Sequence, residues 1–101
     1  MPKFMIAFRG GMPSSPEEGQ RMMLDWNAWM EQLGPALVDK GAGLGKSRFL
    51  AAADREQQAG DPLSGYSTVE APDIDAALDM ARSNPIFSLG GTIEVAEMMQ
   101  M

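Results

Sequence analysis

The sequence predicts a single α+β domain, spanning residues 1–101, in which one antiparallel sheet carries two helices on one face. Segments with strand-like alternation are separated by two segments with helical spacing, in the order β-α-β-β-α-β. Of the seven prolines, all except Pro2 fall in predicted loops, at element boundaries or in the first turn of a helix. The local signals therefore agree with the overall order of elements.

The first third of the chain predicts one strand and one helix. Large apolar residues alternate with smaller or charged ones over 3–9, which is typical of a strand. Ser15-Pro-Glu-Glu18 has the pattern of a capping box with proline at the first helical position. An apolar stripe at spacings of three and four follows and ends at Gly34-Pro35, so the helix ends there.

The middle of the chain predicts one strand between two irregular stretches. Leu37 and Val38 are expected to pack in a short turn, and the glycines of 41–45 indicate a loop. The second strand is predicted over 44–53, although Ala51-Ala-Ala53 is equally helical, and the polar residues of 54–62 predict another loop.

The last third predicts a strand, a helix and a strand. The β-branched and aromatic content of 65–71 favours a strand, and Asp73 is expected to cap a helix that reaches Ser83. Alternation over 91–98 predicts the final strand.

Right-handed crossovers place these elements in a ferredoxin-like fold, with the strands side by side in the order 4-1-3-2. Gly10-Gly11 then lies beside Gly90-Gly91. The expected antiparallel register joins four pairs: Phe8 with Ile93, Ile6 with Val95, Arg9 with Thr92, and Ala7 with Glu94. The first two pairs face the helices and the last two face away.

The sheet face away from the helices mixes apolar and polar side chains. Its predicted members are Met5, Ala7, Arg9, Tyr66, Thr68, Glu70, Thr92, Glu94, Ala96 and Met98. This face is too apolar to be fully solvated and too polar to be a core, so we expect a second copy of the chain to cover it in a homodimer.

Composition excludes several classes of function. A net charge of -6 argues against nucleic acid or a membrane surface as partner. The absence of histidine and cysteine removes the usual zinc ligands, so we predict no metal and no cofactor. The apolar run Phe4–Phe8 is too short for a signal peptide or a membrane span, which predicts a cytoplasmic protein.

Two further patterns give weaker indications of function. The segment 41–47 is similar to a phosphate-binding loop, but Lys40 stands where that motif needs its first glycine, and no helix is predicted after it. The ten methionines could ligate Cu(I), yet methionine more often fills irregular space in a core or a cavity wall, as we expect here.

The chain resembles the YCII-related (DGPF) domain family over nearly its whole length. The segments that carry the resemblance are Lys3–Met5, Arg9–Gly11, Gly65-Tyr66, Val69–Ala71, Asp73–Leu78, Asn84-Pro85 and Gly90–Val95. The resemblance implies a dimeric α+β barrel, in which the sheets of two subunits face each other and enclose a cavity. Relatives discussed as enzymes pair a histidine with an aspartate. This chain has no histidine, and Gly60-Asp-Pro-Leu63 replaces the Asp-Gly-Pro-Phe signature.

The predicted ligand-binding residues lie on the face away from the helices. They are Arg9, Tyr66, Thr68, Thr92 and Glu94. Arg9 suits a carboxylate or phenolate, Tyr66 can donate a hydrogen bond, and Glu94 is the candidate catalytic base. The same charges also fit a purely structural pair. In the predicted sheet, the strand that carries Tyr66 lies beside the first strand and runs parallel to it.

Three functions fit these observations. The first is a small-molecule-binding or accessory protein, built as a homodimer with a cavity between its sheets. The second is a lyase or isomerase acting on a polar, aromatic-derived metabolite through Glu94, Tyr66 and Arg9, and the missing histidine and cysteine argue against the histidine–aspartate chemistry of the family. The third is a structural dimer without a ligand.

Overall fold

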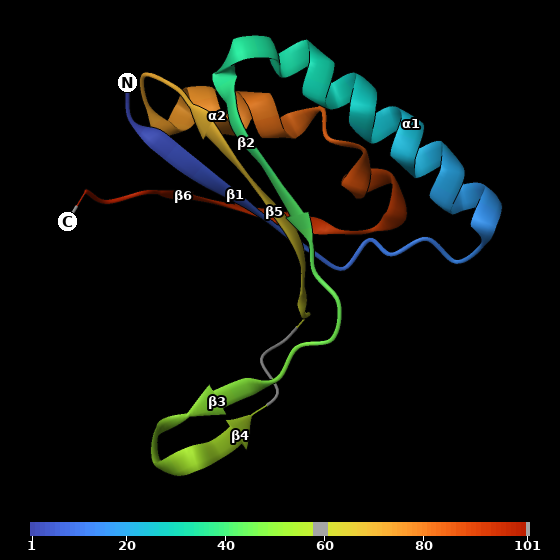
Figure 1. The fold of residues 1–101 in the computed structure, drawn as a ribbon, viewed down its shortest axis with the longest axis vertical. Helices are drawn as coiled ribbons and strands as arrows, with labels where there is room; N and C mark the ends of the chain where they lie inside the picture. Colours follow the sequence, from blue (N-terminus) through green and yellow to red (C-terminus); the bar gives the residue numbers. More distant parts are fainter. Residues whose placement is uncertain (58–60, 101) are drawn as a thin grey trace.

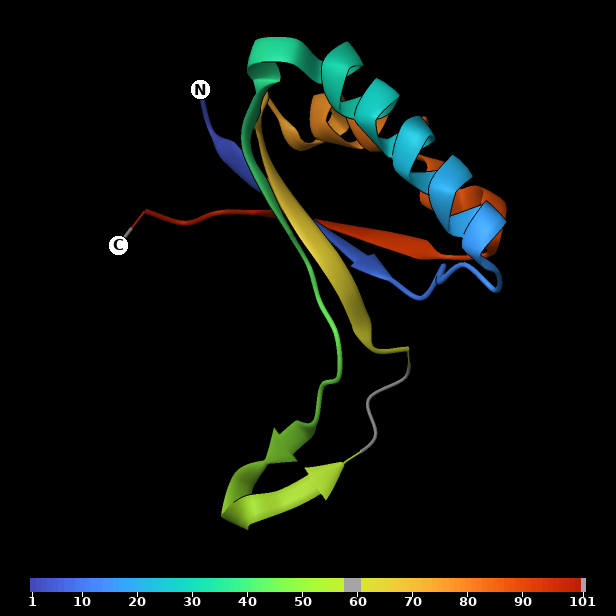
Figure 2. The same cartoon turned by 45° about the vertical axis from the view of Figure 1, so that its right-hand side comes forward.

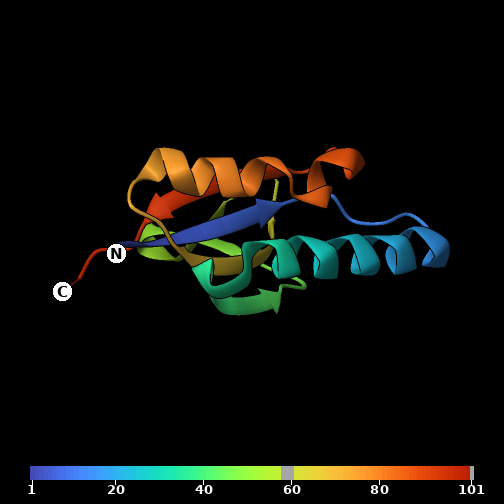
Figure 3. The ribbon, with the colours of Figure 1, turned by 90° about the horizontal axis from the view of Figure 1, so that it is seen from above.

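Four antiparallel strands form the main sheet of the computed structural model, which describes residues 1–57 and 61–100 (Figure 1). The strands lie in the order β2-β5-β1-β6, and their bounds are β1 Lys3–Arg9, β2 Leu37–Gly43, β5 Leu63–Glu70 and β6 Thr92–Glu97. Helices α1 (Pro16–Leu33) and α2 (Ile74–Arg82) lie over one face and run in opposite directions, as the view from above shows (Figure 3). The predicted α+β class, with an antiparallel four-stranded sheet and two helices, is confirmed.

Side-chain caps begin both helices where the sequence predicts. Ser15 Oγ accepts a hydrogen bond from the amide of Glu18 at 3.1 Å, and Asp73 Oδ1 accepts one from the amide of Ala76 at 2.9 Å. Glu18 reaches back to the amide of Ser14 at 2.9 Å, one residue earlier than in a standard capping box. These bonds satisfy amides that the first helical turn leaves without a partner.

The register between the first and last strands of the chain is the predicted one. Strand β1 pairs with β6 through Phe8 and Ile93, Ile6 and Val95, Arg9 and Thr92, and Ala7 and Glu94. The two glycine pairs at the end of these strands also lie side by side, because a Cβ added to Gly11 would lie 3.3 Å from the Cα of Gly91. Both predictions are confirmed.

The core lies between the helices and the central strands. Its largest members on the sheet are Phe4, Ile6 and Phe8, and Trp29 is the buried residue of α1. The indole Nε1 of Trp29 donates to the carbonyl of Met80 in α2 at 2.9 Å. This bond ties the two helices together while the ring packs on the sheet.

The second strand of the sheet lies elsewhere than predicted. It is β2, Leu37–Gly43, and not the segment 44–53. Leu37 pairs with Val69, which brings it to the core side. Gly41 adopts a φ of 73° at an irregularity in the strand, where an added Cβ would overlap the carbonyl of Tyr66. The glycines that indicated a loop are therefore what allows this edge strand to pair closely with β5.

The segment 49–57 forms a hairpin outside the main sheet. Strand β3, Phe49–Ala51, pairs with β4, Arg55–Gln57, across a 3-10 turn at Ala52–Asp54. The hairpin projects away from the helices and the main sheet (Figures 1 and 2). The predicted loop over 54–62 is thus wrong at β4, and its residues 58–60 lie outside the described part of the chain.

Candidate functional site

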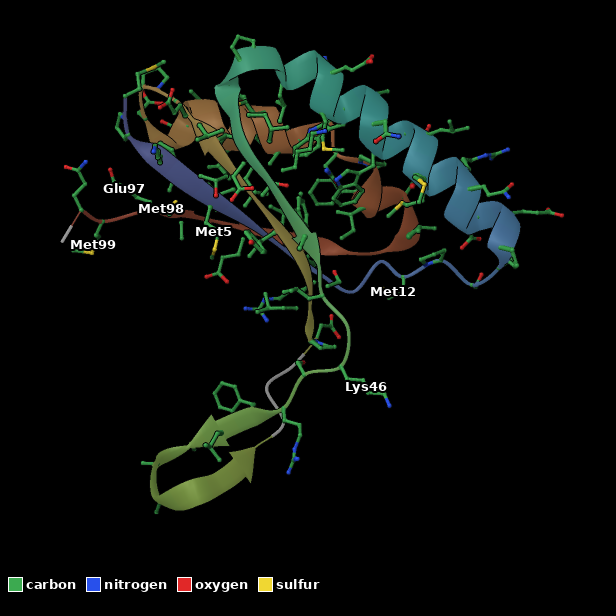
Figure 4. All side chains as sticks on the ribbon, in the orientation of Figure 1. Met5, Met12, Lys46, Glu97, Met98 and Met99 are labelled. Atoms are coloured by element: carbon green, nitrogen blue, oxygen red, sulfur yellow. The ribbon has the colours of Figure 1, made fainter. Side chains whose placement is uncertain are left out.

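The sheet face away from the helices, here called the open face, carries the residues that the sequence predicts as ligand-binding. Tyr66 pairs with Ala7 and Thr68 pairs with Met5, while Glu94 and Thr92 pair with Ala7 and Arg9 from the other side. Cross-strand partners share a face, so all five predicted residues lie on the open face. Figure 4 shows Met5 pointing away from the helices on this side.

Strand β5 is antiparallel to β1, which corrects the parallel pairing assumed for Tyr66. Tyr66 still lies on the open face, because residues directly opposite each other project to the same side of the sheet in parallel and antiparallel pairs alike.

Arg9 is the last residue of β1, and its guanidinium contacts oxygen atoms of two other residues. Its Nη2 lies 3.4 Å from Glu94 Oε1, and its Nη1 donates to the carbonyl of Asp61 at 3.2 Å. The side chain of Arg9 is 35% exposed and that of Glu94 is 65% exposed. In a single chain this pair is therefore well solvated, and a base at Glu94 would need a covering partner to remove it from water.

The structure places a cavity of about 370 Å³ on the opposite side of the sheet. This cavity, here called the helix-side cavity, lies between α1 and the β2–β5 edge of the sheet. Its apolar walls are Phe8, Met12, Met22, Trp26, Met30 and Ile86. Its volume is within the range of natural small-molecule sites.

Glycine makes the helix-side cavity possible. Gly43 pairs with Gly65, and Gly65 also pairs with Phe8, so this part of the sheet presents no side chain beyond Phe8 toward α1. The helix cannot fill the gap, because Trp29 already occupies the buried position beside the sheet. The space remains open in front of Trp26, whose ring meets Phe8 edge-on at a centroid distance of 4.7 Å.

Polar groups enter the helix-side cavity from β2 and β5. Lys40 borders it, and the carbonyl of Lys40 accepts a hydrogen bond from Ser67 Oγ at 2.9 Å. Ser64 also borders it, at a register shift where Leu63 and Gly65 pair with successive residues of β1. Its Oγ is buried and has no hydrogen-bond partner within the described part of the chain. The site therefore has mostly apolar and aromatic walls, with Lys40, Ser64 and Ser67 on its polar border.

Trp26 and Trp29 follow each other at helical spacing on α1, and the structure gives them different environments. Trp29 is 2% exposed and belongs to the core, whereas Trp26 is half-buried and lines the helix-side cavity. The signal that could have found this cavity is the combination of an aromatic stripe on α1 with glycines on two paired strands. That signal requires β2 to be placed at 37–43.

No group of three or more His, Cys, Asp or Glu residues is arranged to hold a metal ion within residues 1–57 and 61–100. In the same ranges, neither helix is long and apolar enough to cross a membrane.

Comparisons with models of known protein families and with curated proteins found no match.

Proposed function

We propose that this chain is a small-molecule-binding protein and that the helix-side cavity is its binding site. The supporting observation is a cavity of about 370 Å³ bounded by Phe8, Trp26 and Met30. Concave sites with apolar and aromatic walls and a few polar groups are the usual form of ligand sites. The aromatic ring of Trp26 and the flexible methionines suit a planar, largely apolar molecule.

We further propose that two copies associate through their open faces. The strand order β2-β5-β1-β6 supports a ferredoxin-like subunit. The open face holds the partly exposed Met5 at its centre, between the small or polar side chains of Thr68 and Ala96. This arrangement supports membership of the YCII-related family and its dimeric α+β barrel, because burial against a second sheet would remove this mixed face from water.

Binding is tested with 2-naphthamide, a neutral planar probe, followed by NMR of the uniformly ¹⁵N-labelled protein. We expect the indole N–H signal of Trp26 to move with probe concentration. The indole of Trp29 provides an internal control, because it is buried and donates to Met80. Its signal should move less.

A matched pair of variants locates the site. Met22→Trp fills the helix-side cavity and should abolish the shifts, whereas Met23→Trp adds the same bulk at a side chain that is 68% exposed. Retention of binding by Met22→Trp, or shifts confined to the open face, would place the site elsewhere.

A further inference from the structure

The hairpin of β3 and β4 leaves two large apolar side chains in water. Phe49 and Leu50 are neighbours in β3, so they point to opposite faces of the hairpin, and they are 49% and 63% exposed. Strands β3 and β4 pair with each other and, among the described strands, with no other. An isolated two-stranded hairpin is marginally stable in water, so a surface that covers these side chains would stabilise it.

Residues 45–57, here called the arm, extend to the side of the sheet on which the open face lies. The helices lie above the sheet in Figures 1 and 2, and the arm bends below it. Met5 of the open face points to this same side in Figure 4. A second copy that packs on the open face therefore comes within reach of the arm.

The charge of the arm favours a second copy of the chain as its partner. The three basic residues of the arm, Lys46, Arg48 and Arg55, outnumber its two acidic ones, Asp54 and Glu56, so its net charge is +1. The whole chain carries -6, which leaves -7 on the rest. Surfaces of opposite charge attract each other, so the acidic body of another copy suits the arm.

The open face offers an apolar contact toward the end that lies opposite the arm. The arm joins the sheet at the Arg9 end of β1, where Leu63 pairs with Arg9 and the face carries a charged pair. At the other end, the amide of Met98 donates to the carbonyl of Lys3 at 2.9 Å, which continues the pairing of β1 with β6 and places Met98 on the open face. Met98 is 48% exposed and Met5, between the two ends, is 37% exposed. The apolar side chains of an arm therefore match the methionine end better than the charged end.

We propose that two copies exchange arms, so that Phe49 and Leu50 of each copy cover the methionine end of the other copy's open face. The inference rests on the proposed association through the open faces. A two-fold axis perpendicular to the strands sets the arm of each copy against the far end of its partner, and the symmetry forms both contacts at once. Each arm then closes one end of the space between the two sheets, so that this space is incomplete in a single chain.

The first test measures the dissociation constant of the dimer by analytical ultracentrifugation. Phe49→Ser combined with Leu50→Ser should raise this constant by about 10-fold or more, because two apolar contacts with the partner are lost. The matched control is Met23→Ser combined with Leu24→Ser, a pair of neighbours on α1 that are 68% and 71% exposed. The control should change the constant by less than about 2-fold.

The second test locates the arm on the partner. The chain has no cysteine, so cross-links come only from cysteines that are introduced. Leu50→Cys combined with Met98→Cys should give a disulfide-linked dimer on mild oxidation, because the two positions meet between copies. Either substitution alone should leave the chains unlinked, since equivalent positions lie at opposite ends of the dimer. Leu50→Cys combined with Met23→Cys is the matched control and should also stay unlinked.

The outcomes separate this inference from the proposed dimer. Equal effects of the two serine pairs, or linking by Leu50→Cys alone, overturn the exchange of arms, and so does a failure of the pair at 50 and 98 to link. The open-face dimer still stands in these cases if Met5→Glu dissociates it. A wild-type protein that is monomeric at micromolar concentration overturns both.

Discussion

Arg9 and Glu94 lie 85 residues apart in the sequence, yet their side chains meet at 3.4 Å across β1 and β6. The pairing follows from the register of the two strands, which sets Arg9 opposite Thr92 and Ala7 opposite Glu94. The small side chain of Ala7 leaves room for the two long ones to approach diagonally. Arg9 also donates to the carbonyl of Asp61, so it joins the residues just before β5 to the last strand.

The exposure of this pair predicts a small effect on stability. Glu94→Gln should lower the free energy of unfolding by less than about 1 kcal/mol, because solvated ion pairs contribute little. Arg9→Ala should have the larger effect, since it also removes the bond to Asp61 and the packing of the side-chain stem. Urea denaturation of both variants provides the measurement. A loss above about 2 kcal/mol for Glu94→Gln would show that the pair is buried in the protein as it exists in solution.

The glycine contact between the ends of β1 and β6 predicts a steric effect. A Cβ at Gly91 would lie 2.5 Å from Ile86 Cγ1 and 3.0 Å from the carbonyl oxygen of Arg9. Ile86 is buried, so it has little room to move away. Gly91→Ala should therefore lower the free energy of unfolding by about 1–3 kcal/mol.

Gly45→Ala is the control for this substitution, because a Cβ at Gly45 meets no atom within 4 Å. Its effect should stay within about 0.5 kcal/mol. If thermal or chemical denaturation gives equal values for the two variants, the close approach at Gly91 is not present in solution.

The bond between Trp29 and Met80 predicts different roles for the two tryptophans. Trp29→Phe leaves the carbonyl of Met80 without the indole donor and reduces the volume of the core. We expect a loss of about 1–3 kcal/mol in the free energy of unfolding. Trp26→Phe should lose less, because Trp26 is half-buried beside the helix-side cavity. Guanidinium denaturation compares them, and a larger loss at Trp26 would contradict the division of roles.

The parts of the fold that the sequence predicts well are those with local signals. Ser15 and Asp73 mark helix starts because a cap needs only the next three residues. The alternation of β1 and β6 fixes which side chains face the helices, and the glycines that follow one strand and precede the other suggest the register. These features require no knowledge of distant contacts.

Strand β2 could not be predicted in the same way. Asp39, Lys40 and Gly41 have low strand propensity, and their pairing depends on β5, whose Ser67 holds the carbonyl of Lys40. Charged residues and an irregularity are common at a sheet edge, where they discourage pairing with other chains. The helix-side cavity borders this strand, so a sheet with its second strand at 44–53 does not predict the cavity.

The open face predicts that the protein is a dimer at micromolar concentration. Met5 is 37% exposed at the centre of this face in a single chain, with Thr68 and Ala96 as its cross-strand partners. Sedimentation equilibrium of the wild-type protein should therefore report twice the mass of the chain.

Met5→Glu places a charge where the second sheet would exclude water, so it should shift the equilibrium to monomer. Met23→Glu is the matched control, because Met23 lies on α1 with 68% of its surface exposed and should leave the dimer intact. A wild-type monomer at these concentrations, or equal dissociation by both variants, would rule out association through the open face and with it any cavity between two sheets.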